Sequence, residues 1–213
     1  GKQILQTTID GYRKLRNSLR YLLGALDGFS DAERVSVDAM PPLEQFILHR
    51  LWELDKTVRA AYEAYDFRTV WREVSEFCAG DLSTLYFDVR KDALYCDRPD
   101  SERRRACRTV MDEIFQRLTA WLSPLAAFTC EEAWTTRFPE AGSNALRTIP
   151  DPPDAWRNEA EAARWESVQQ PLSLVTMSLE GHRRDKDIGS SLEASPKVTA
   201  GAKSLEAFAG LDV

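Results

Sequence analysis

The sequence has little of the chemistry that a self-contained active site needs. It contains only two histidines, His49 and His182, and neither stands near another plausible ligand or catalytic partner. Glycine-rich phosphate loops, the Gly-x-Ser-x-Gly nucleophile motif and the His-Glu-x-x-His zinc motif do not occur. Adjacent acids such as Glu131 and Glu132 are expected to be solvated rather than catalytic. We therefore do not expect these residues to carry catalysis themselves.

Cysteine is scarce and widely spaced. Cys78, Cys96, Cys107 and Cys130 form no Cys-x-x-Cys pair, whereas structural zinc sites usually bring ligands in pairs about two to four residues apart. We expect reduced, mostly buried thiols and no bound metal.

Long hydrophobic runs are missing as well. No apolar stretch approaches the roughly 20 residues that a membrane-spanning helix requires. No charged start leads into an apolar stretch and a small-residue cleavage site, so a secretory signal is not expected. These absences predict a cytoplasmic protein that does not bind membranes.

Apolar residues recur every three or four positions along most of the chain, which is the period of amphipathic helices. Thr129-x-x-Glu132 matches a capping box and predicts the start of the helix that carries Trp134. Trp134 and Trp165 have apolar neighbours at helical spacing and are expected to pack in the core or between domains rather than to stack on bases. The pattern predicts helices over 4–26, 43–65, 67–78, 82–89, 110–121, around 134, and over 165–179.

The segment 139–157 concentrates prolines together with Gly142 and Asn144, which is typical of an irregular connection. We therefore expect an all-α helical bundle over 1–138, a connection over 139–158, and a third part over 159–213. The third part is predicted to hold a long helix and the start of a small truncated α/β appendage, with a strand at 195–200 and a short helix at 203–208. A lone strand cannot pair its backbone groups, so this pattern suggests a piece of a longer polypeptide.

The formal net charge of −6 argues at first against a nucleic-acid partner, because Lys and Arg carry phosphate binding. The charge is unevenly distributed, however. Residues 1–30 hold five basic and two acidic side chains, whereas residues 31–90 hold seven basic and twelve acidic ones. The first helix is therefore locally basic.

Three arginines of the first helix share one face. At about 100° per residue, Arg13, Arg16 and Arg20 fall within an arc of about 60° beside the apolar stripe. Such a row suits a phosphate backbone, and Tyr12 and Asn17 add stacking and hydrogen-bonding groups suited to unpaired bases. The alternative, a solvated face whose arginines pair with acids from 31–90, stays open.

A second basic cluster, Arg103–Arg105 with Arg108, lies in the first turns of its helix. The helix dipole disfavours cations at this end unless an anion compensates. Either Asp97, Asp100 and Glu102 supply that anion, or a polyanionic partner does.

Blocks along nearly the whole chain resemble the anticodon-binding domain of the isoleucyl-tRNA synthetase family. The stretch Tyr12-Arg-Lys-Leu-Arg-Asn-Ser-Leu-Arg-Tyr-Leu-Leu-Gly24 resembles its opening helix. Valyl and leucyl synthetases share the helical scheme and remain alternatives, as does a helical protein-interaction scaffold without RNA binding. The blocks Lys91-Asp-Ala-Leu-Tyr95 and Asp187-Ile-Gly-Ser-Ser-Leu-Glu-Ala194 favour the isoleucyl member. Further matching blocks are Ala61–Phe67, Asp81–Asp88 and Leu125–Trp134.

The resemblance implies a class Ia enzyme that uses ATP to attach isoleucine to its tRNA. The His-x-Gly-His and Lys-Met-Ser-Lys-Ser signatures of the adenylate site do not occur in this sequence, so no cofactor is expected here, and ATP and Mg are expected in a catalytic domain outside it. The implied partners are the tRNA anticodon stem-loop and the rest of the synthetase polypeptide, with no DNA and no membrane. The expected RNA-binding residues are Tyr12, Arg13, Arg16, Asn17 and Arg20, with Arg104, Arg105 and Arg108 as a second set.

Overall fold

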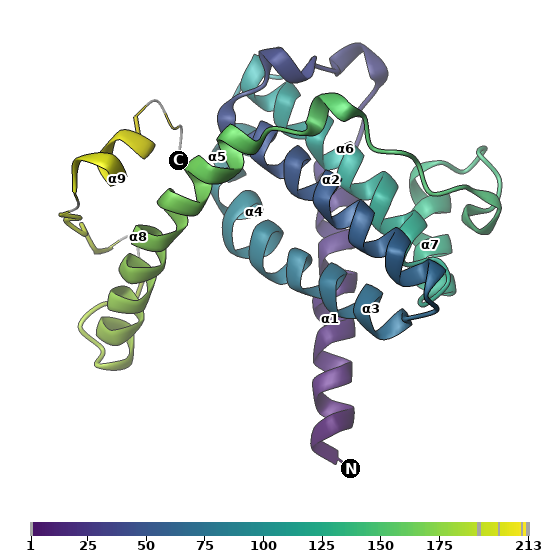
Figure 1. Cartoon of the computed structure of the whole chain (residues 1–213), viewed down its shortest axis with the longest axis horizontal. Helices are drawn as coiled ribbons and strands as arrows, with labels where there is room; N and C mark the ends of the chain where they lie inside the picture. The colour runs from purple at the N-terminus through teal and green to yellow at the C-terminus, as the bar shows by residue number, and fades with distance from the viewer. Residues whose placement is uncertain (1, 191–192, 200, 210, 212–213) are drawn as a thin grey trace. The chain divides into compact units, whose positions relative to one another are not determined.

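The computed structural model describes residues 2–190, 193–199, 201–209 and 211, and every regular element among them is helical (Figure 1). The chain divides into two units, residues 1–157 (unit 1) and 158–213 (unit 2). Unit 1 is the all-α bundle that the apolar periodicity predicts.

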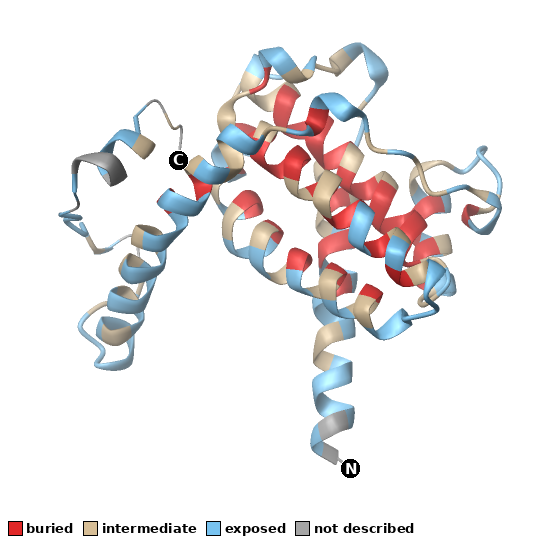
Figure 2. Ribbon diagram, viewed as in Figure 1, coloured by how far each residue is buried: buried red, intermediate tan, exposed pale blue. Residues whose placement is uncertain are grey.

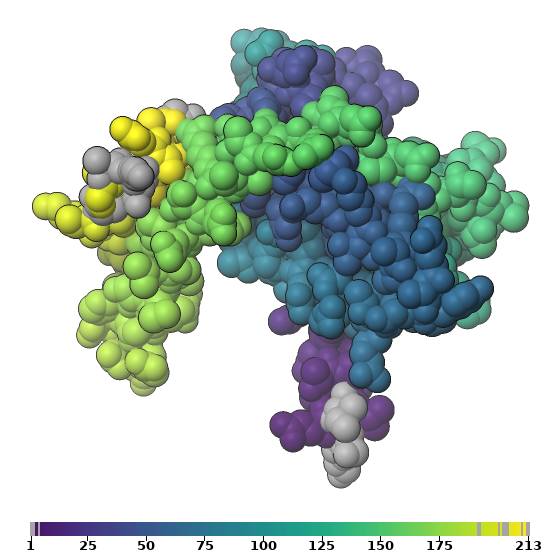
Figure 3. All heavy atoms as spheres, viewed as in Figure 1, coloured from purple at the N-terminus to yellow at the C-terminus, as the bar shows by residue number. Residues whose placement is uncertain are grey.

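The first helix, α1 (Lys2–Ala25), is longer than the bundle that it joins. Leu15, Leu19 and Leu22 are buried, as the apolar stripe requires. Leu5 and Ile9 continue the same stripe but are 65% and 48% exposed. The purple N-terminal turns accordingly stand clear of the rest of unit 1 in Figure 3. Only the C-terminal half of α1 therefore contributes to the core.

Helices α2 (Pro42–Glu63) and α3 (Phe67–Phe77) form an antiparallel pair. Pro42 stands at the first helical position, where its missing N–H costs no hydrogen bond. Tyr65 takes a left-handed backbone conformation (φ 55°) between the helices, and the Asp66 carboxylate caps α3 by accepting from the Thr69 N–H at 3.1 Å. Two short 3₁₀ segments, η1 (Asp31–Glu33) and η2 (Val37–Ala39), precede the pair.

The expected interruption near residues 79–81 is a π-helical segment, η3 (Cys78–Tyr86), rather than a break. The Ser83 and Thr84 hydroxyls donate to the carbonyls of Cys78 and Ala79, five residues earlier, at 2.7 and 2.8 Å. The short helices α4 (Phe87–Val89) and α5 (Lys91–Tyr95) continue the same path. The wide turns keep Leu82 and Tyr86 in the core although Gly80 lies among them.

Helix α6 (Glu102–Trp121) is the centre of unit 1 and packs against α1, α2, α5 and α7 (Ala127–Arg137). Its residues from Ala106 to Trp121 are mostly buried, and Figure 2 shows the buried positions gathered on α6 and on the inner sides of its neighbours. The Trp121 indole donates to the buried Asp55 carboxylate of α2 at 3.1 Å.

The irregular segment 139–157 packs on the bundle and contains two 3₁₀ turns, η4 (Asn144–Leu146) and η5 (Asp154–Trp156). The Asn144 amide donates to the Thr119 carbonyl at 3.0 Å, and the Arg117 guanidinium lies 4.1 Å from the centre of the Trp156 ring. Trp134 of α7 is buried beneath the Arg147 guanidinium, which confirms its expected packing role.

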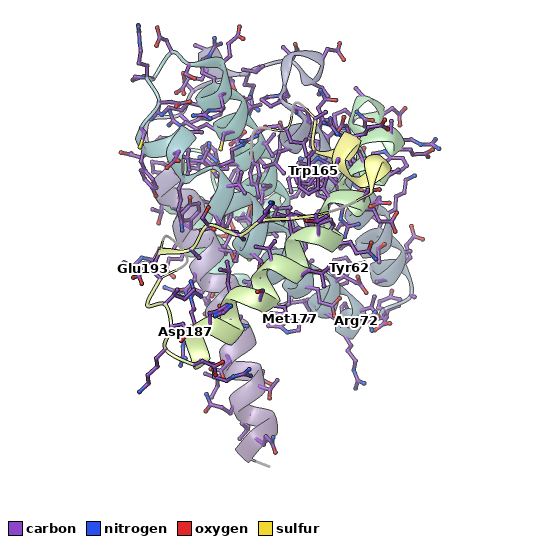
Figure 4. All side chains as sticks on the ribbon, turned by 90° about the vertical axis from the view of Figure 1, so that its left-hand side faces the viewer. Tyr62, Arg72, Trp165, Met177, Asp187 and Glu193 are labelled. Carbon is purple, nitrogen blue, oxygen red and sulfur yellow. The ribbon has the colours of Figure 1, made fainter. Side chains whose placement is uncertain are left out.

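Unit 2 begins with the long helix α8 (Glu159–Arg184), as the sequence predicts, and contains the short helix α9 (Ala202–Ala207). Figure 4 labels Trp165 near the start of α8, Met177 farther along it and Asp187 beyond its end; Trp165 is buried and Met177 exposed. The predicted strand at 195–200 is wrong for 195–199, which have no regular structure, and residue 200 lies outside the described residues. No strand occurs among the described residues of unit 2, so a strand at 195–199 would have no partner there.

Candidate nucleic-acid interface

The arginine face of α1, defined as Arg13, Arg16 and Arg20, is exposed as its helical spacing predicts. Arg13 makes an exposed ion pair with Asp10, one turn earlier on the same helix, at 3.3 Å. Arg20 and the neighbouring Asn17 have no hydrogen-bond or ion-pair partner among the residues that the structure describes. None of the three guanidinium groups pairs with an acid from 31–90, in contrast to the alternative reading of the sequence.

Arg16 reaches across to α7 and holds the Glu132 carboxylate with two nitrogens. Its Nη1 lies 2.8 Å from Glu132 Oε2, and its Nη2 donates to Glu132 Oε1 at 3.1 Å. The hydrogen bond to Glu132 raises the pKa of Arg16 above its already high usual value, so the guanidinium is charged throughout the working range. A planar guanidinium that binds a carboxylate in this two-pronged way has the geometry that also suits a phosphate.

A hollow of about 290 Å³ lies beside this pair, and we call it the α1–α7 hollow. The guanidinium groups of Arg16 and Arg20 provide hydrogen-bond donors for phosphate oxygens. The Thr136 hydroxyl already donates to the Glu132 carbonyl at 2.6 Å. Leucine and alanine side chains form the apolar part of the lining. The lining residues are Arg16, Leu19, Arg20, Leu23, Thr129, Glu132, Ala133 and Thr136.

The predicted capping box is wrong, because α7 begins two residues before Thr129 and has Ala126 at its N-cap without a side-chain cap. The Thr129 hydroxyl instead shares a 2.7 Å hydrogen bond with the Tyr12 hydroxyl, and Glu132 binds Arg16. Both residues thus face α1 rather than the helix terminus. Tyr12 is thereby fixed to α7 with its ring partly exposed.

The second arginine cluster is mostly turned toward the protein. Arg103 is paired with Asp97 at 2.6 Å, as one of the two sequence interpretations expects. Arg104 donates to the Leu94 carbonyl at 3.3 Å, and Arg105 donates to the Glu33 carbonyl at 3.1 Å. These contacts tie the start of α6 to α5, to the α5–α6 connection and to η1.

Arg108 is the member of the predicted set that lies farthest from solvent. It is 4% exposed, it donates to the carbonyls of Ala25 and Asp27 at the end of α1, and it pairs with Glu33 at 2.6 Å. A guanidinium with these contacts has no exposed group to offer a phosphate. We therefore assign Arg108 to the packing of α1 on α6 and omit it from the interface.

Sequence reasoning missed Tyr95, which α5 places beside α1. Tyr95 is 70% exposed and lines a second hollow of about 340 Å³, here called the α1–α5 hollow. Tyr21 forms another wall; burial, followed by its interaction with Tyr95, raises the pKa of the Tyr21 phenol well above 10. The only sequence signal was an aromatic residue at the end of the Lys91–Tyr95 block. Lys91, at the start of the same block, pairs with Asp88 at 2.6 Å.

No group of histidine, cysteine and acidic side chains with metal-holding geometry occurs among the described residues. Cys78, Cys107 and Cys130 are buried and Cys96 is exposed. Burial raises the pKa of the Cys78 and Cys130 thiols to about 12, so both are protonated at neutral pH. None of the described helices is long and apolar enough to cross a membrane.

A family model described as the anticodon-binding domain of tRNA ligase matches residues 44–198. The isoleucine–tRNA ligase of Caulobacter vibrioides is 63% identical over 214 residues, and those of Bartonella henselae and Agrobacterium fabrum are 48% and 47% identical. Each alignment covers 100% of this chain and 22% of the relative, so the chain spans about a fifth of the length of these proteins. The arginine face precedes the residues matched by the family model but lies within these three alignments.

Proposed function

Because the chain belongs to the family of anticodon-binding domains of tRNA ligases, we propose that it binds the anticodon stem-loop of an isoleucine tRNA. The observation that carries this proposal is the exposed arginine face of α1 beside the α1–α7 hollow. Guanidinium groups in a row neutralise successive phosphates and set the position of an RNA strand. Asn17 and Tyr12 lie on the same part of α1 and offer the amide and aromatic contacts that unpaired bases take.

The proposed parent protein is an isoleucine–tRNA ligase of the class Ia type. In it, ATP drives the attachment of isoleucine to tRNA, and ATP and magnesium act in the catalytic part of the enzyme, outside the residues of this chain. The second proposed partner of this module is the rest of that polypeptide. The proposed location of the enzyme is the cytoplasm. The module contributes to choosing the tRNA through bases that lie far from the site of aminoacylation.

A salt-dependent binding titration tests the proposal. Counterion release makes the logarithm of the binding constant fall linearly with the logarithm of salt concentration, by about 0.7–0.9 for each phosphate contact. Replacing both Arg16 and Arg20 by alanine is expected to weaken binding of the isoleucine tRNA and to flatten this slope. The helical circular dichroism should not change, because both side chains are exposed.

A matched control is the Arg68→Ala, Arg72→Ala pair, which removes two exposed arginines from α3. This control should leave both the affinity and the slope unchanged. Unaltered binding by the Arg16→Ala, Arg20→Ala protein would place the contact surface elsewhere. A chain that binds no tRNA at any salt concentration would favour the scaffold, and preference for a valine or leucine tRNA would favour one of the related enzymes.

A further inference from the structure

The α1–α5 hollow combines aromatic and polar groups that the arginine face alone does not explain. Its lining residues are Asn17, Arg20, Tyr21, Gly24, Ala25 and Tyr95. Arg20 also lines the α1–α7 hollow, so the two hollows share one guanidinium. A nucleotide held here can therefore place its base in one hollow while a phosphate meets the arginine face.

Both aromatic walls of the hollow are held by neighbouring structure. The Tyr21 ring packs against Phe87 with the ring centres 4.4 Å apart, and its hydroxyl donates to the Phe87 carbonyl at 3.4 Å. Tyr95 ends α5, where the N–H groups of the next two residues both donate to the Asp92 carbonyl, at 2.8 and 3.2 Å. An exposed ring on a fixed backbone loses little conformational freedom when a base stacks on it.

Gly24 lines one side of the hollow without a side chain. A β-carbon placed on it would meet no atom within 4 Å, so packing does not require glycine at this helical position. Glycine in a helix is otherwise unfavourable compared with alanine. The missing side chain thus widens the hollow without serving the core.

The polar groups of the hollow match the edge of a base. The Asn17 amide offers both a donor and an acceptor, and it has no hydrogen-bond partner among the described residues of the chain. Arg20 is likewise unpaired within them and supplies a positive charge. Aromatic faces, an amide and a guanidinium are the groups with which proteins hold unstacked RNA bases.

We propose that the α1–α5 hollow binds one unpaired nucleobase of the RNA, stacked on Tyr95 and hydrogen-bonded by Asn17. This inference rests on the proposed function, because the strand must first be held by the arginine face. It adds Tyr95 and Gly24 to the interface and gives each a separate role.

The probe is a synthetic stem-loop with the anticodon arm sequence of an isoleucine tRNA, titrated with the full 213-residue chain. Tyr95→Ala is expected to weaken binding roughly 5- to 150-fold, the range found for removal of one base–aromatic stack. Tyr95→Phe should bind as the unmodified chain does, because the ring face remains. The salt slope should not change in either variant, since no charge is lost.

Two further variants separate stacking from a structural effect. Gly24→Leu fills the hollow with a good helix former, so it should weaken RNA binding by a similar factor while leaving the thermal midpoint unchanged or higher. Tyr65→Ala removes another exposed tyrosine, at the turn between α2 and α3, and should leave the affinity unchanged. Stem-loops with one abasic nucleotide identify the bound base, because Tyr95→Ala should cause no additional loss on that RNA.

The inference is overturned if Tyr95→Ala and Gly24→Leu bind the stem-loop like the unmodified chain, or if Tyr65→Ala weakens binding as much as Tyr95→Ala. It is also overturned if every abasic stem-loop still distinguishes Tyr95→Ala from the unmodified chain. In each of these cases the arginine face can still bind RNA with its salt dependence intact. Absence of any RNA binding by the unmodified chain would instead remove the proposed function itself.

Discussion

At the level of single residues, the contact between Arg16 and Glu132 determines how available the arginine face is to RNA. The carboxylate occupies two guanidinium nitrogens that would otherwise face a phosphate. Both side chains are about half exposed, and such pairs are weak because water and salt screen them. A phosphate can therefore displace Glu132 at small cost, and the displaced carboxylate then repels the RNA.

Glu132→Gln should strengthen tRNA binding by up to about fivefold, the upper end of what losing one exposed ion pair is worth. The amide retains the shape of the side chain but no longer competes for Arg16 as an anion. The salt slope should also become steeper, because Arg16 then neutralises a phosphate more completely. Titrations at several salt concentrations measure both quantities.

Glu131→Gln is the matched control, because the Glu131 carboxylate accepts from Ser143 and from the Asn144 N–H rather than from an arginine. It should leave the tRNA affinity unchanged. Weaker binding by Glu132→Gln would mean that Glu132 positions Arg16 for the RNA instead of competing with it.

Residues whose exposure could be predicted from sequence depend on local helical geometry. Those that could not be predicted depend on contacts with residues far away in the sequence. The exposure of Arg13, Arg16 and Arg20 follows from helical period alone, which needs no partner from elsewhere in the chain. The burial of Arg108 depends on Ala25, Asp27 and Glu33, which lie 75 to 83 residues away. No local pattern carries that information, and the same holds for the closeness of Tyr95 to α1.

At the level of elements, periodicity predicted the helices well because each buries an apolar stripe. The π-helical turns at Cys78–Tyr86 could not be predicted from the α-helical period. The apolar residues Leu82 and Tyr86 are buried in the π-helix too, so the apolar pattern does not distinguish the two helix types. The strand predicted near 195–200 rested on local composition, which cannot supply the neighbouring strand that pairing requires. The capping box failed because α7 begins at Ala127, with Ala126 at its N-cap and no side-chain cap, so Thr129 lies inside the helix rather than at its start.

The end of α1 is held by Arg108, and this contact gives the element-level prediction. The guanidinium binds two carbonyls near the C-terminal end of the helix, where the dipole favours a cation, and it also pairs with Glu33. Arg108→Met should lower the free energy of unfolding by about 3 kcal/mol, because it leaves a partly buried carboxylate and two carbonyls without their partner. Urea denaturation followed by circular dichroism measures the loss.

Arg104→Met provides the comparison, because Arg104 makes one long hydrogen bond to the Leu94 carbonyl. It should cost less than about 1 kcal/mol. The folded Arg108→Met protein should bind tRNA as the unmodified chain does. Reduced affinity together with unchanged stability would return Arg108 to the interface.

At the level of the whole molecule, the negative net charge repels a polyanion at long range. The arginine face of α1 attracts it only at short range. The chain carries 28 basic and 34 acidic side chains, and unit 1 alone carries 22 and 25. Attraction therefore depends on the local arrangement of α1 rather than on the net field. The net charge therefore argues against a nucleic-acid partner, whereas the placement of the arginines on the first helix argues for one.

The isolated chain should consequently bind an isoleucine tRNA with a Kd weaker than about 1 µM at physiological salt, because specific complexes of nanomolar affinity use much larger and more basic interfaces. Three arginines on one helix face limit the number of phosphates neutralised, so the slope of log K against log salt should correspond to about two or three contacts. A titration over a series of salt concentrations measures both values. A submicromolar Kd, or a slope corresponding to many more phosphates, would mean that a larger basic surface than α1 contacts the RNA.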